Sequence, residues 1–190
     1  MARTAAYEVK GSAFRGYVTQ IEKLGALGEV RARVPPETLA ALETPPLPSV
    51  WIDAIIVEDL IGALEAARGL DAVRAVTKNG QQGTMLPVVR PILTGLLRLF
   101  GATPATLLAR FPDFTRTVQR GIQFRWESES PRAGRLVVTF GRQHVPRHAF
   151  IGMESACWLI LDLCGLKGTV APTEISSDGT STSGKVPVRW

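Results

Sequence analysis

The chain has 190 residues, of which 45% are hydrophobic and 21% are charged, and its net charge is +5. This composition is ordinary for a globular protein and supplies enough apolar surface for one core, so we expect a single domain over residues 1–190. No run reaches the roughly 18 apolar residues of a membrane span, and the N-terminal segment lacks the apolar stretch of a signal peptide, so we expect a cytoplasmic protein.

The first half of the chain has mainly helical patterns. A short strand over Tyr7–Lys10 is followed by Ser12, a residue type that often caps a helix N-terminus. Apolar residues at helical spacing then predict helices over the ranges 14–24, 36–42 and 51–68, and a loop near Gly69 is expected before the segment 72–76.

The middle of the chain is also predicted to be helical. The apolar segment Met85–Phe100 contains two early prolines, so its helix is expected to begin near Pro91. Thr103 followed by Pro104 is typical of a helix start, and Pro112 is expected to bend or restart that helix before 114–120.

After residue 120 the period changes from helix to strand. Alternating apolar and polar residues over Ile122–Glu127 and Leu136–Phe140 predict a β-hairpin. An apolar helix follows over Ala149–Leu163, and a second hairpin is expected from Thr169–Ile175 and Lys185–Trp190. This order predicts an α+β fold with a helical N-terminal half and an antiparallel sheet of about four to five strands, with helices packed on one face.

Positive charge is concentrated between Arg116 and Arg147, where seven arginines accompany two acidic residues, Glu127 and Glu129. Such a region could be a docking surface for an acidic partner or a dimer interface, or simply a solvated hairpin. The candidate surface residues are Arg116, Arg120, Arg125, Arg135, Arg142 and Arg147. Strict alternation would place Phe124 and Trp126 on the opposite face from Arg125, so we do not expect base stacking or nucleic-acid binding there.

Residues typical of catalysis are few. There is no nucleophile elbow, phosphate-binding loop, dinucleotide fingerprint or zinc-protease motif, so we expect no catalytic residues and no enzyme activity. The two histidines, His144 and His148, are separated by Pro146, which argues against a shared helix face and a metal site. An enzymatic alternative would require His148 to meet Cys157 or Asp162.

Five stretches carry a resemblance to a known family: VKGSAFRGYVTQIEKLG, LPSVWIDAIIVEDLIGAL, GIQFRW with GRLVVTF, FIGMESACWLILDLCG, and the terminal VPVRW. In this order the chain resembles a myxobacterial paralogous family of unknown function, within the wider group of vinyl-reductase-type, TRAPP and haem-NO-binding domains.

The resemblance implies helices on one side of an antiparallel sheet, a sensory or scaffolding role, an apolar pocket and homodimerisation. In vinyl-reductase-type relatives, cysteines near the final turn help bind zinc, but this chain has serines there, near Ser176 and Ser183. Haem binding in the group needs a histidine on a helix, and the segment Gly152–Leu163 has none. We therefore expect neither a metal nor a cofactor.

These observations favour a non-enzymatic regulatory module that binds a small apolar ligand, a protein partner, or both. The candidate pocket residues lie between sheet and helix: Phe124, Trp126, Phe140, Met153, Cys157 and Leu161. The same residues could instead form a filled core. Two alternatives stay open, a scaffold that docks through the Arg116–Arg147 region, and a haem- or metal-binding sensor that uses His148.

Overall fold

We describe the protein from a computed structural model that covers residues 5–84 and 103–190. The predicted helix over Met85–Phe100 lies outside these residues. Within them, no helix combines the length and the apolar character that crossing a membrane requires.

The N-terminal half forms a helical layer. Its members are α1 (Gly11–Lys23), α2 (Leu27–Arg31), α3 (Pro36–Glu43) and α4 (Ile55–Thr84). α4 is interrupted at Gly69, whose φ of 78° is a left-handed conformation that glycine adopts without a steric penalty. The apolar faces of these helices pack around Phe14, Ile21, Leu60 and Leu64, all fully buried.

A small antiparallel sheet joins this layer to the rest of the chain. It has the order β2-β1-β3, from β1 (Glu8–Lys10), β2 (Trp51–Asp53) and β3 (Gln119–Arg120). The predicted helix over 51–68 is therefore wrong at its start, because Trp51–Asp53 pairs with β1. Asp53 ends the strand, and its carboxylate accepts the backbone N–H of Ile55 at 2.8 Å as α4 begins.

The start of α1 also differs from the prediction. Lys10 occupies the N-cap position and Ser12 lies inside the helix. The N–H groups of Gly11 and Ser12 donate to the carbonyls of Val50 and Pro48, at 2.8 and 3.0 Å. The loop before β2 thus satisfies donors that a capping side chain would otherwise satisfy.

The C-terminal half is built on a five-stranded antiparallel sheet of order β4-β5-β8-β6, with β7 also paired to β8. Its strands are β4 (Ile122–Ser130), β5 (Ala133–Phe140), β6 (Thr169–Val170), β7 (Glu174–Ser177) and β8 (Thr182–Arg189). The helices that accompany it are α6 (Pro104–Ala109), α7 (Phe111–Thr115) and α8 (Arg147–Leu163). The predicted α+β fold with an antiparallel sheet and a helical N-terminal half is confirmed.

The tail of the chain is a central part of this sheet. β8 lies between β5 and the short strands β6 and β7, and its residues alternate between buried and partly exposed. Trp190 follows the strand, and its ring lies 6.2 Å from that of Trp126 on β4. The terminal residues, which the composition alone would make a loose tail, therefore hold the sheet together.

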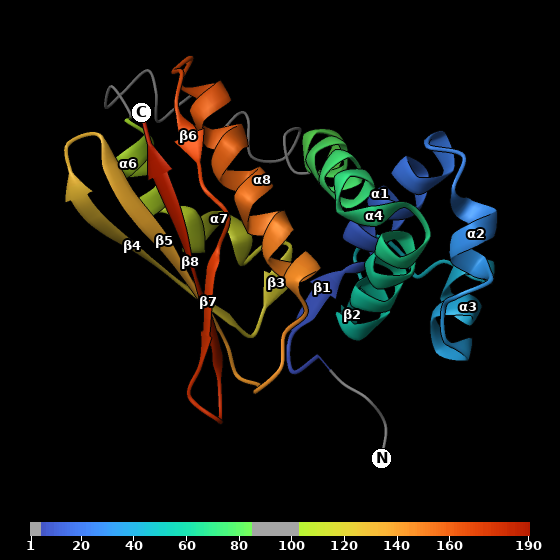
Figure 1. Ribbon diagram of the computed structural model, residues 1–190. Coiled ribbons are helices and arrows are strands. Elements are labelled where there is room, and N and C mark those ends of the chain that lie inside the picture. The colour runs from blue at the N-terminus through green and yellow to red at the C-terminus, as the bar shows by residue number, and fades with distance from the viewer. Residues whose placement is uncertain (1–4, 85–102) are drawn as a thin grey trace.

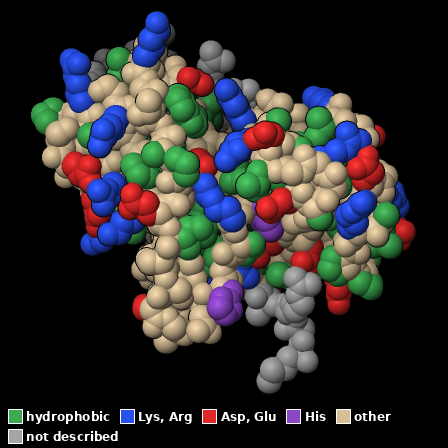
Figure 2. Space-filling model, viewed as in Figure 1, with side chains coloured by type: hydrophobic (Ala, Val, Ile, Leu, Met, Phe, Trp, Pro, Cys, Tyr) green, Lys and Arg blue, Asp and Glu red, His purple; other side chains and the backbone are tan. Residues whose placement is uncertain are grey.

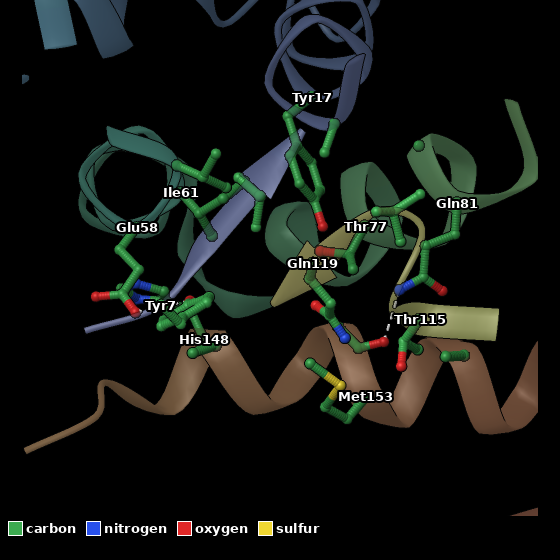
Figure 3. Close-up of a pocket in the computed structure, with 18 of the residues that line it drawn as sticks. Tyr7, Tyr17, Glu58, Ile61, Thr77, Gln81, Thr115, Gln119, His148 and Met153 are labelled. Carbon is green, nitrogen blue, oxygen red and sulfur yellow. Dashed lines mark hydrogen bonds between the residues drawn. The ribbon is translucent and has the colours of Figure 1, made fainter. Parts of the chain in front are cut away.

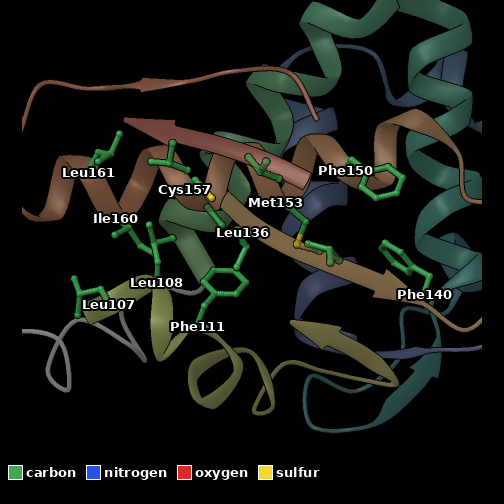
Figure 4. Packing of buried hydrophobic residues seen from close by; sticks show 14 residues of the cluster. Leu107, Leu108, Phe111, Leu136, Phe140, Phe150, Met153, Cys157, Ile160 and Leu161 are labelled. Carbon is green, nitrogen blue, oxygen red and sulfur yellow. The ribbon is translucent and has the colours of Figure 1, made fainter. Parts of the chain in front are cut away.

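α8 lies between the sheet and the helical layer (Figure 1). On one side Phe150, Cys157 and Leu161 pack with Leu136 and Phe140 of β5 (Figure 4). On the other side, Ile151 packs with the cluster of α1 and α4. This one helix therefore contributes to both cores, and its second face forms the floor of the site described next.

Candidate functional site

A cavity of about 220 Å³ lies where α8 meets the helical layer. Its walls come from α1, α4, β1, α8 and the segment from α7 to β3 (Figure 3). Five α8 residues face it, at the spacing of one helix side: His148, Ala149, Gly152, Met153 and Ala156. The cavity is therefore enclosed by elements from both halves of the fold.

Small residues leave this space open. Gly152 has no side chain, and a Cβ there would come no closer than 3.8 Å to Thr77 on α4. Gly80 lies on the opposite wall, where a Cβ would contact the ring of Tyr17 at 3.6 Å. A larger residue at position 152 would project toward α4 and occupy part of the cavity.

A buried charged group stands at one end of the cavity. The carboxylate of Glu58 on α4 accepts the hydroxyl of Tyr7 at 2.8 Å and forms an ion pair with Arg142. The Glu58 and Arg142 side chains are only 6% and 16% exposed. Burial and the neighbouring Glu58 carboxylate hold the pKa of Tyr7 well above its usual range, so Tyr7 remains a neutral hydrogen-bond donor.

His148 forms a second link between the halves. Its Nδ1 lies 2.9 Å from the Glu65 carboxylate on α4, and its side chain is 9% exposed. Within the described part of the chain its Nε2 has no hydrogen-bond partner. A carboxylate on one nitrogen and a free second nitrogen is an arrangement seen for both metal ligands and general bases.

The six residues predicted to line a pocket have mostly another role. Phe140, Cys157 and Leu161 are buried in the core between α8 and the sheet, and Phe124 and Trp126 pack against that core. Met153 is the member of the set that also lines the cavity. The cavity lies between α8 and the helical layer. Between α8 and the sheet, the predicted pocket residues form a packed core, which is the filled-core alternative given above.

Cys157 and His148, two reactive groups of the enzymatic alternative, lie on different sides of α8. Cys157 faces the core, where burial raises the pKa of its thiol, while His148 faces α4 and pairs with Glu65. A thiol with a raised pKa is a poor nucleophile.

The predicted basic surface is largely paired with acidic residues. Arg120 contacts Glu8 at 2.5 Å, Arg125 contacts Glu127 at 2.5 Å, and Arg135 contacts Glu129 at 2.6 Å. Two further pairs are the buried Arg142–Glu58 pair and Arg147–Glu154, while Arg116 is exposed. On the face seen in Figure 2, Lys and Arg side chains accordingly lie among Asp and Glu side chains.

The final turn holds hydroxyls where the resembling proteins carry zinc-binding thiols. Ser176 and Ser183 lie opposite each other in β7 and β8. Asp178 organises the turn, and the N–H groups of Ser181 and Thr180 that donate to its carboxylate lower its pKa strongly. Among residues 5–84 and 103–190, no cluster of three His, Cys, Asp or Glu side chains could hold a metal ion.

Sequence patterns did not identify the residues that line the cavity. The pattern places Tyr17 only on the apolar side of its helix, and it predicts a helix over 114–120 whose last two residues, Gln119 and Arg120, form β3 in the structure. The glycine at 152 was a weak signal, because a glycine within a helix often has a packing or functional reason.

Comparisons with known proteins identify the fold. No family model matches the chain, and no curated protein matches it. Among solved structures, an oxygen-binding H-NOX domain related to soluble guanylate cyclases is 12% identical, with a TM-score of 0.63 over 95% of this chain and 94% of that one. An Fe(II) unliganded H-NOX mutant from K. algicida is 14% identical, with a TM-score of 0.65 over 95% and 97%.

A third match, a Cs H-NOX mutant with 4-cyano-L-phenylalanine, is 12% identical and gives a TM-score of 0.66 over 95% of both chains. The chain thus has the fold of H-NOX domains, which confirms the predicted likeness to the haem-NO-binding group at the level of fold. Membership of the myxobacterial family stays a prediction.

Two further solved structures that match this chain, one of them of the H-NOX family, were studied for haem redox potential and haem distortion, so we tested whether the described residues of this chain fit haem. His148 offers a free, carboxylate-backed nitrogen, which favours a ligand role. However, 220 Å³ is below the roughly 300–1,000 Å³ of pockets that hold drug-sized molecules, and a porphyrin is larger than these. No Lys or Arg is among the described lining residues to bind the haem carboxylates, and Glu58 adds a carboxylate instead. The described lining of this cavity therefore does not fit haem.

Proposed function

We propose that the protein is a non-enzymatic regulatory module that holds a small, mostly apolar ligand between α8 and the helical layer. The observation that carries this proposal is the partly open cavity itself, which is lined from both halves of the fold. Concave, mainly apolar spaces with a few polar groups are typical small-molecule sites. The likeness to H-NOX domains, one of them oxygen-binding, supports a ligand-binding role for this fold.

Regulation follows from where the ligand would lie. α8 belongs to the sheet core on one face and contacts α1 and α4 on the other. A ligand in the cavity would contact both layers. It would favour the position of the helical layer relative to α8 and the sheet in which it fits best. A partner protein that binds one arrangement more tightly would then respond to the ligand.

Native mass spectrometry and thermal shift measurements test this function. We expect the purified protein to carry, or to bind from a set of small apolar compounds, a molecule that raises its melting temperature. Gly152→Leu should abolish the effect by filling the cavity, and Gly152→Ala should retain it, since one methyl fits at ordinary contact distance. If Gly152→Leu does not fold, Ala13→Leu replaces it in the test, because a leucine at position 13 would fill the cavity from α1. Equal shifts in filled and unfilled variants would contradict the proposal.

The His148 alternative has one observation in its favour, the unpartnered Nε2. Addition of haem followed by absorption spectroscopy tests it, with His148→Ala as the matched variant. Because the cavity is smaller than a porphyrin and its described lining offers a carboxylate but no Lys or Arg, we expect no spectrum of coordinated haem. A haem band that His148→Ala removes would establish the sensor in place of our proposal.

Docking through the basic region and homodimerisation stay predictions. Arg142 is unsuitable for testing them, because its charge neutralises buried Glu58. Arg116→Glu and Arg125→Glu change exposed positions instead. Unchanged oligomeric mass and unchanged partner capture would remove this surface from consideration.

A further inference from the structure

Most polar side chains in the cavity wall already have partners within the protein. The Thr77 hydroxyl donates to the Val73 carbonyl at 2.7 Å, and the Thr115 hydroxyl donates to the Phe111 carbonyl at 3.1 Å. The Gln81 amide nitrogen donates to the Gly152 carbonyl at 2.6 Å. Tyr7 likewise donates to Glu58, so these four groups are occupied, whereas Gln81 Oε1 and His148 Nε2 have no partner among the described residues.

Two other lining side chains also have free polar groups. The hydroxyl of Tyr17, from α1, and the amide of Gln119, from β3, have no side-chain hydrogen bond to another described residue. In Figure 3 the Tyr17 hydroxyl points into the space above α8, and Gln119 lies between Tyr17 and Met153 in that view. Both groups can donate and accept a hydrogen bond. They are the natural recognition groups for a polar atom on a bound molecule.

The charges of the wall favour a neutral occupant. Glu58 is the acidic lining residue, and Arg142 and Tyr7 already bind its carboxylate. No described lining residue is Lys or Arg. The His148 ring in turn faces the Glu65 carboxylate, so a charged ligand would lose its hydration and meet no unpaired opposite charge among these residues, which is strongly unfavourable.

The volume limits the size of this occupant. An engineered apolar cavity of about 150 Å³ binds benzene. A cavity of about 220 Å³ therefore accepts one benzene-sized ring with a few further heavy atoms.

We propose that the cavity selects a neutral, single-ring-sized apolar molecule that carries one hydroxyl, carbonyl or amide group, and that Tyr17 and Gln119 recognise this group. The inference rests on the proposed function and adds the chemical class of the ligand. It assigns Tyr17 and Gln119 to specificity, while the apolar wall of Ile61, Val57 and Met153 supplies most of the contact area.

Calorimetric titration with toluene, phenol and benzoate tests the class, because the three share one ring and differ in polarity and charge. The decisive quantity is the ratio of the Kd for toluene to the Kd for phenol. We expect this ratio to fall about tenfold from the wild type to Tyr17→Phe, as loss of one buried hydrogen bond predicts. Gln119→Leu should lower the ratio in the same direction, and benzoate should bind at least about a hundredfold more weakly than phenol.

Thr139→Val is the control, since it removes a hydroxyl on the opposite face of the sheet, and it should leave the ratio unchanged. If no compound binds, or if Gly152→Leu does not weaken binding, the proposed function itself fails. If toluene and phenol bind but neither Tyr17→Phe nor Gln119→Leu changes the ratio, the function stands and the ligand class is overturned. Tight benzoate binding would likewise overturn the neutral class. Circular dichroism of each variant confirms that it is folded.

Discussion

Glu58 and Arg142 lie 84 positions apart in the chain, and their side chains form a buried ion pair that joins α4 to the loop after β5. The pair also receives the Tyr7 hydroxyl, so three separate segments meet at one carboxylate. This cluster closes one end of the cavity and fixes the helical layer against the sheet layer.

Removing one partner of this pair should destabilise the protein strongly. Arg142→Ala leaves the Glu58 carboxylate buried without its cation, and a loss of about 3–5 kcal/mol in unfolding free energy is expected. Urea denaturation measures it. The control is Arg135→Ala, whose partner Glu129 is partly exposed, with an expected loss below about 1 kcal/mol. Similar losses in both variants would show that the buried pair has no special role.

Gly184 on β8 should tolerate no side chain. A Cβ at this position would lie 2.4 Å from the Phe150 ring and 2.7 Å from Thr173, both within the packed core region. Gly184→Ala is therefore expected to lower the unfolding free energy by about 1–3 kcal/mol. Gly28→Ala is the matched change, in α2 with nothing within 4 Å of the new Cβ, and should be neutral or stabilising by up to about 1 kcal/mol. A melting temperature unchanged by Gly184→Ala would contradict the packing of α8 on β8.

Tyr17 should make stability depend on pH in the alkaline range. Burial raises its pKa to about 12 in the folded protein, against about 10 in the unfolded chain. The folded state therefore holds the phenol proton more tightly, and its contribution is complete below pH 10 and lost as the pH rises from 10 to 12. Melting temperatures over this range should fall less steeply in Tyr17→Phe than in the wild type. Parallel curves would indicate that the phenol titrates normally.

The two cysteines should differ in reactivity. Burial raises the thiol pKa of both, but Cys157 is enclosed in the core whereas Cys164 is only half-buried at the end of α8. A thiol reagent is expected to label Cys164 in the native protein and Cys157 only after unfolding. Cys164→Ser should therefore abolish native labelling. Rapid labelling of Cys157 in that variant would favour the enzymatic alternative.

Local sequence patterns were sufficient for much of the fold. The period of two in Ile122–Glu127, Leu136–Phe140 and Lys185–Trp190 predicted strands, and all three segments lie in the five-stranded sheet. The same reasoning predicted α8 and the Thr103–Pro104 helix start, where the Thr103 hydroxyl accepts the N–H of Thr106. The alternation of a strand and the cap of a helix depend on residues close together in the chain, so a short stretch of sequence is enough to predict them.

The β2-β1-β3 sheet and the cavity depended on contacts that no local pattern records. β1 was predicted as a short strand, but β2 is three residues long, too short to show a period, and it becomes a strand because it pairs with β1 across the fold. The sequence does not show that the arginines between Arg116 and Arg147 pair with acidic residues, since partners such as Glu8 and Glu58 are distant in the chain. The sequence by itself determined which segments are helices and strands over most of the described chain. The tertiary structure alone decided which face of α8 is filled and which encloses a space, because that depends on how side chains from separate elements meet.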